Sequence, residues 1–154
     1  MILTQTPLKN CGGNSKGLQK ILFCDYSFFE GYNLDADGII TALRGSQTWL
    51  YWKLLDLPNC EFTETEVNGN YLQTLTLTIQ GTSNEINNAL KQLKATEIIC
   101  IFLDSNGKYK FIGENKIKMI AKEIKIGENV YNFTLRTIGD VTAKEVLNSY
   151  GKTL

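Results

Sequence analysis

Residues 60–80, which read CEFTETEVNGNYLQTLTLTIQ, decide the fold. From residue 71 to residue 80 apolar and polar side chains alternate with a period of two, which is typical of a strand with one face in the core. Asn68-Gly69 stands before this strand, and the pair favours a type I′ turn because both central residues need a positive φ. Residues 60–67 and 71–80 are therefore predicted to form a hairpin.

A second hairpin and one helix are predicted further along the chain. Residues 97–103 are almost continuously apolar, as in a central strand covered on both faces, and the turn at 104–107 leads into a strand over 108–112. Between the hairpins, Thr82 and Glu85 have the spacing of a capping box. The helix that follows has its apolar residues at helical spacing, namely Ile86, Ala89, Leu90 and Leu93.

The remaining segments complete a mainly β (α+β) chain. Further strands are expected at residues 18–24, 38–43, 47–55 and 131–136, and residues 117–126 fit a strand or a helix, of which the strand is preferred. We predict a β-sandwich or distorted barrel with one α-helix between the two hairpins, as the strand and turn spacing favours. Residues 1–140 form the domain, and residues 141–154 form a C-terminal arm or a short helix capped by Thr142 and Glu145.

Composition argues against an enzyme. The 154 residues carry 16 basic and 16 acidic side chains and no histidine, so the commonest general base and metal ligand is missing. Residues 33–38 imitate the start of a calcium loop, but its twelfth position is Arg44. The glycines at 12–17 have the wrong order for a phosphate-binding loop. We expect no catalytic residues, no cofactor and no metal, with solvated roles for the carboxylates Asp35, Asp37, Glu61, Glu64 and Glu66.

The four cysteines are predicted to be buried free thiols. Cys11, Cys24, Cys60 and Cys100 lie far apart without a C-x-x-C pair. The first nine residues lack the apolar run of a signal peptide, and no stretch of about 18 apolar residues occurs, so no membrane association is expected.

Two groups of residues are candidates for a subunit interface. Residues 47–55 have large apolar side chains at both odd and even positions, which favours a central strand covered on both faces. Alternatively, Trp49 and Tyr51 contribute to an interface between subunits, where aromatic residues are enriched. The stripe formed by Thr74, Thr76 and Thr78 is either an ordinary solvent face or an uncharged sheet surface that joins neighbouring copies or lines a ring.

Several ordered motifs together resemble a group of small virion proteins encoded in tailed phages and prophages of Bacteroidetes, including crAss-like phages. The motifs are KNCGGN at 9–14, FTET at 62–65, NGNY at 68–71, LTLT at 75–78, the helix after Gly81, and DSNGKY at 104–109 followed by Gly113-Glu114. The resemblance spans most of the chain. It implies a tail-tube-like β-sandwich with a flanking helix that assembles into rings.

The resemblance further implies a structural role in the virion, after synthesis in the bacterial host cytoplasm. Copies of the chain would form a homo-oligomeric ring of six or twelve in the tail tube or the head-tail neck, next to other tail or neck proteins. DNA would pass through this conduit without specific binding, and zero net charge suits that role because basic contacts would retain phosphate. The alternatives are a capsid-decorating or receptor-binding module and, second, a small enzyme.

Overall fold

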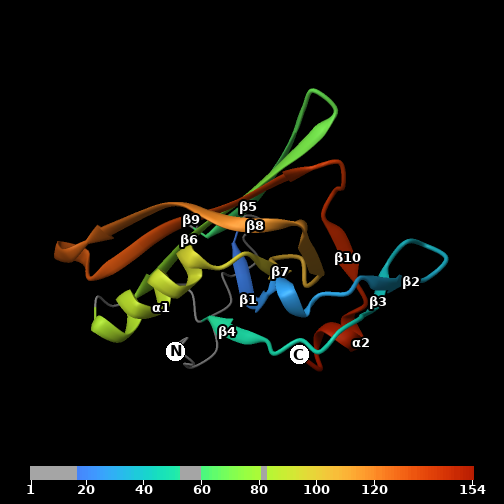
Figure 1. The fold of residues 1–154 in the computed structure, drawn as a ribbon, viewed down its shortest axis with the longest axis horizontal. Coiled ribbons are helices and arrows are strands. Elements are labelled where there is room, and N and C mark those ends of the chain that lie inside the picture. The colour runs from blue at the N-terminus through green and yellow to red at the C-terminus, as the bar shows by residue number, and fades with distance from the viewer. Residues whose placement is uncertain (1–16, 53–59, 81–82) are drawn as a thin grey trace.

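The computed structural model describes residues 17–52, 60–80 and 83–154, and their ten strands form one curled sheet (Figure 1). The strands are β1 (Leu18–Asp25), β2 (Tyr32–Leu34), β3 (Ile40–Leu43), β4 (Leu50–Trp52), β5 (Glu61–Val67), β6 (Asn70–Gln80), β7 (Ile98–Asp104), β8 (Tyr109–Lys125), β9 (Val130–Gly139) and β10 (Lys144–Val146). The helices are α1 (Asn84–Ala95) and α2 (Asn148–Gly151), with 3₁₀ turns η1 (Tyr26–Phe28) and η2 (Ile126–Glu128). Among these described helices, none has the length and apolar character needed to cross a bilayer. The mainly β class predicted from sequence is confirmed.

The sheet has two parts that share one strand. Sheet A has the order β2-β3-β10-β8-β7-β1-β4, and sheet B has the order β5-β6-β9-β8. The first part of β8 pairs with β7 as far as Ile117, and from Lys118 onward β8 pairs with β9. Because β8 belongs to both sheets, its path sets the angle between them.

A bend in β8 allows this change of partner. Gly113 has φ 114° and Lys116 has φ 67°, both outside the range that a regular strand uses. A Cβ atom on Gly113 would lie 2.8 Å from the Cα of Ile99 on β7. Glycine is therefore required at this position by its conformation and by the close approach of the neighbouring strand.

Two tyrosines hold the bend. The Tyr32 hydroxyl donates a 2.8 Å hydrogen bond to Glu114 Oε2, and the Tyr26 hydroxyl donates a 3.4 Å bond to the Glu114 carbonyl. The Lys116 ammonium lies 5.3 Å from the centre of the Tyr26 ring. Burial raises the pKa of Tyr32 to about 12, with further contributions from the hydrogen bond to Glu114 and from its negative charge.

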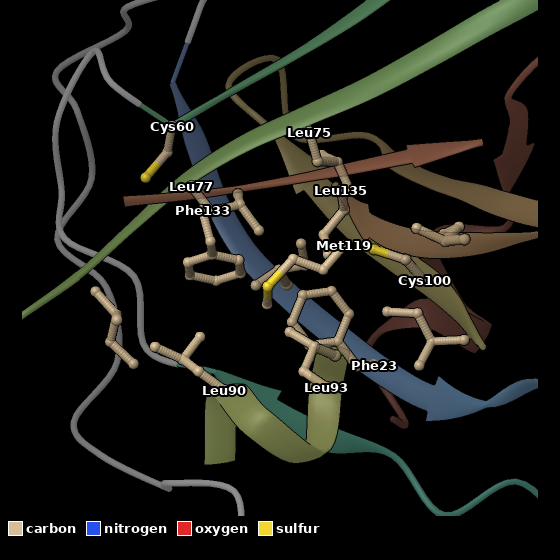
Figure 2. Packing of buried hydrophobic residues seen from close by; sticks show 14 of the residues in the cluster. Phe23, Cys60, Leu75, Leu77, Leu90, Leu93, Cys100, Met119, Phe133 and Leu135 are labelled. Atoms are coloured by element: carbon tan, nitrogen blue, oxygen red, sulfur yellow. The ribbon is translucent and has the colours of Figure 1, made fainter. Parts of the chain in front are cut away.

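The main core lies between the two sheets and α1 (Figure 2). Phe23 of β1, Met119 of β8 and Phe133 of β9 meet there with Leu90 and Leu93 of α1. A second cluster covers the other face of sheet A and includes side chains from β3, β7, β8 and β10. Strand β7 contributes to both clusters, and its residues 98–102 are all at most 3% exposed. The central, doubly covered strand predicted for residues 97–103 is thus confirmed.

The two hairpins and the helix between them are also confirmed. Asn68 and Gly69 both have positive φ, as a type I′ turn requires. The helix α1 buries the four predicted apolar residues. Its N-cap is Ser83, whose hydroxyl accepts from the Ile86 N–H at 3.3 Å, so the predicted cap at Thr82 is wrong by one position. Thr82 itself lies outside the described residues.

The C-terminal segment corrects another prediction. Residues 144–146 form β10, antiparallel to β8 and parallel to β3, where a helix capped by Thr142 was expected. Residues 144–146 form a strand and not a helix because pairing with β3 and β8 buries Val146 completely. The short helix α2 begins only at Asn148, and Tyr150 anchors it by accepting a hydrogen bond from the Leu43 N–H.

Three predicted buried thiols are found in the described residues. Cys24 and Cys100 are free and buried, and Cys60 is buried with its Sγ 3.9 Å from the Thr78 carbonyl oxygen, while Cys11 lies outside the described part of the chain. Burial raises the pKa of Cys100 well above its usual value and is also the main cause of the raised pKa of Cys24. Cys24 and Cys100 therefore stay protonated and pack as small apolar side chains.

Replacement of Gly113 tests the bend. Gly113→Ala should lower the free energy of unfolding by about 1 kcal/mol or more, because the new Cβ combines a strained φ with contact against β7. The matched control is Gly127→Ala, where an added Cβ meets nothing within 4 Å. Urea unfolding followed by circular dichroism measures both changes, and equal stability of the two variants would contradict the requirement for glycine in β8.

Candidate subunit interface

The outer face of sheet B is rich in threonine. Side chains alternate between the two faces along β5, β6 and β9, so the residues before and after each core residue point outward. We name this surface the threonine face. Its members are exposed or half-buried threonines with aliphatic neighbours, namely Thr63, Thr65, Thr74, Thr76, Thr134, Leu72 and Ile138.

The predicted threonine stripe divides in two. Thr74 and Thr76 are half-buried and contribute to the threonine face, whereas Thr78 is only 3% exposed. The Thr78 hydroxyl lies 2.7 Å from Oδ1 of Asn132, the residue directly opposite on β9, and donates a hydrogen bond to it. Thr78 therefore stabilises the pairing of β6 with β9 within one chain and has little surface left for a neighbour.

Tyr51 belongs to β4, and Trp49 directly precedes that strand. As far as sheet A is described, β4 lies at one of its edges. Among the described strands β4 pairs only with β1, so the central position expected for residues 47–55 is wrong for the part that is described. Residues 53–55 of that prediction lie outside the described residues. Trp49 is half-buried against the second core cluster, and Tyr51 lies beneath the Lys20 ammonium at 5.7 Å. Both aromatic rings keep some surface at this edge.

Charged residues of three strands also lie on this face, namely Glu61 of β5, Lys118 and Glu123 of β8, and Arg136 of β9. Lys118 of β8 and Arg136 of β9 are directly opposite each other on the outer side of sheet B. Lys118 also lies 3.5 Å from Glu97, but no ion pair within the described residues includes Arg136. The extra residue Ile120 forms a bulge in β8 beside this pair and is 49% exposed. We call Lys118, Ile120 and Arg136 the Arg136 patch.

The hairpin of β5 and β6 projects beyond the core (Figure 1). All residues from 63 to 70 are exposed, on both faces of the hairpin. Glu64 is engaged at its base, where one carboxylate oxygen accepts from Gln73 Nε2 and from the Ala143 N–H at 2.7 Å each. Beyond this contact the tip carries Glu66 and Val67 without cover from other described residues.

A cleft lies beside β5. It has a volume of about 460 Å³, and Phe62 and Phe102 in its wall have ring centres 4.9 Å apart. Glu61, Asp104 and Lys110 also line the cleft. The Asp104 carboxylate is occupied, because it accepts from the backbone N–H groups of the turn that follows β7. The cleft therefore combines an aromatic wall with a carboxylate and an ammonium group.

The calcium-like sequence at 33–38 forms a polar turn between β2 and β3. Asp35 Oδ1 accepts from the N–H groups of Asp37 at 2.8 Å and Ile39 at 3.0 Å, which uses that oxygen to fix the turn. Across residues 17–52, 60–80 and 83–154, no group of three or more Asp, Glu, Cys or His side chains has the arrangement of a metal site.

Sequence reasoning found the threonine face in part, from the alternation of β6. It missed the Arg136 patch and the cleft. The patch depends on the register shift at Ile120, and the cleft joins residues of β1, β5, β7 and β8, so neither leaves a local pattern in the sequence.

Comparison with protein-family models, with curated proteins and with solved structures found no match for this chain.

Removal of the Thr78 hydroxyl tests its structural role. Thr78→Val should reduce the free energy of unfolding by about 1–3 kcal/mol, because the partner oxygen of Asn132 loses its hydrogen bond in a buried position. Thr76→Val on the same strand is the control, and we expect a change within about 0.5 kcal/mol since this side chain is partly solvated. Chemical unfolding of both variants makes the comparison. A smaller loss for Thr78→Val than for Thr76→Val would contradict the assignment.

Proposed function

We propose that the chain is a non-enzymatic structural protein of a tailed-phage virion that assembles with its own copies into a ring of the tail or the head-tail neck. The observation that carries this proposal is the threonine face, a broad sheet surface that is rich in threonine and has exposed aliphatic side chains. Threonine hydroxyls on such a surface can hydrogen-bond across a contact, while their methyl groups and the neighbouring aliphatic residues lose solvent.

The shape of the chain supports contact with more than one neighbour. The projecting hairpin and the threonine face lie in the same sheet, and the hairpin tip extends past the core (Figure 1). An assembly in which one copy uses its hairpin and the next uses its sheet is head-to-tail. Such contacts close into rings when the rotation between copies permits.

The assignment to a phage tail or neck comes from the sequence motifs that resemble small virion proteins of Bacteroidetes phages. Zero net charge supports a role in a conduit, because a lumen that bound phosphate groups strongly would slow the passage of DNA. The copies in such a ring would contact other tail or neck proteins above and below.

The cleft beside β5 favours a second candidate, a receptor-binding or capsid-decorating module. Pockets with an aromatic wall and a few polar groups are typical of ligand sites. In that case the chain would be a monomer or trimer, and the cleft would bind the partner.

A charge placed on the threonine face tests the proposed assembly. Thr74→Lys should weaken self-association by about tenfold or more, because the new ammonium lies opposite Thr63 and Arg136, has no carboxylate directly across from it and would be buried in the contact. Asn88→Lys adds the same charge on the exposed side of α1 and should leave assembly unchanged. Mass photometry and electron microscopy of the purified proteins measure the size of the particles. A wild-type chain that stays monomeric at high concentration and is missing from assembled virions contradicts the proposal.

A further inference from the structure

We propose that the tip of the β5–β6 hairpin of one copy binds the Arg136 patch of a second copy. This inference rests on the proposed self-assembly and names the two surfaces that meet. It follows from the charges, exposed side chains and strand register of the described residues.

Arg136 has no ion pair within the described residues, and Lys118 beside it shares Glu97 with Lys116. Like charges directly opposite each other on neighbouring strands destabilise a sheet, and Lys118 and Arg136 occupy such positions. Glu97 is shared between Lys116 and Lys118, so its negative charge is already divided. Arg136 itself is exposed. A carboxylate from outside would relieve this repulsion.

The hairpin tip supplies a carboxylate that its own chain does not use. Glu66 is exposed, and no described ion pair includes it. It is paired with Tyr71 in the register of β5 and β6, whereas Arg136 is paired with Thr74. Tyr71 and Thr74 differ by an odd number of positions, so Glu66 and Arg136 lie on opposite faces of sheet B. The two charges of one copy therefore face away from each other.

Exposed aliphatic side chains accompany the charges on both surfaces. Val67 on the tip is 42% exposed, and Ile120 in the patch is 49% exposed. Ile138, two residues after Arg136 on the same strand face, is 54% exposed. Val67 points to the opposite face of the hairpin from Glu66, so in a contact of Glu66 with Arg136 the apolar burial comes from Ile120 and Ile138.

The two surfaces are different parts of the chain, so the contact is head-to-tail. Each copy offers one hairpin and one patch, and each copy therefore has two neighbours. This arrangement agrees with a ring and differs from a two-fold dimer, in which the same surface would be used twice.

Charge reversal tests the contact. Glu66→Lys and Arg136→Glu should each weaken self-association by about five- to tenfold, because an attractive surface pair becomes repulsive. The double variant Glu66→Lys with Arg136→Glu should recover most of the wild-type association, since the pair is restored with opposite polarity. Sedimentation velocity over a range of concentrations measures the three variants beside the wild type.

Matched controls and salt dependence complete the experiment. Glu30→Lys and Lys91→Glu make the same charge changes at exposed positions away from both surfaces and should leave association unchanged. Association of the wild type should weaken from 0.05 to about 0.5 M salt, because the pair is solvent-accessible. If the wild type assembles and neither single reversal weakens it, or the double variant shows no recovery, the proposed contact is wrong while the proposed function stands. If the wild type remains monomeric, both are wrong.

Discussion

The bend in β8 is the constraint on which the rest of the structure depends. One strand hydrogen-bonds to β7 in sheet A and to β9 in sheet B, so the two sheets curl around a shared core without a loop between them. The change of partner requires glycine at 113, because any Cβ there would meet the backbone of β7. Once the sheets are set at this angle, α1 covers the open side of the core with Leu90 and Leu93.

This arrangement uses the two sheets differently. Sheet A is covered on both faces, by the main core on one side and on the other by the second cluster, against which Tyr26, Phe29 and Tyr150 pack. The described core lies on one face of sheet B, and the other face carries threonines, aliphatic side chains and charged residues such as Arg136 and Lys118. Among the described residues, the outer side of sheet B and the hairpin that extends from it are the surfaces through which we propose that copies of the chain meet. A head-to-tail contact through these two surfaces is the physical basis of the proposed ring.

The sequence predicts the local elements and misses those that depend on distant partners. Asn68-Gly69 and the alternation after it determine a hairpin within about 20 residues, and the spacing of Ile86, Ala89 and Leu90 determines a helix. By contrast, Val146 joins a strand only because β3 and β8 lie on either side of it, which overrides the capping pattern at Thr142. The threonine stripe was predicted from alternation, but burial of Thr78 depends on Asn132, 54 residues away. The Arg136 patch arises from a bulge that shifts the register, so the pattern of the sequence alone does not contain it.

The central claim is that copies of the chain meet through the outer side of sheet B. Amide hydrogen exchange by mass spectrometry, at dilute and at concentrated protein, tests this claim most directly. The account predicts that deuterium uptake falls with concentration in residues 63–72, 116–122 and 134–138, while uptake in α1 stays the same. Uptake in these three segments that does not depend on concentration, in a sample that assembles, would contradict the account.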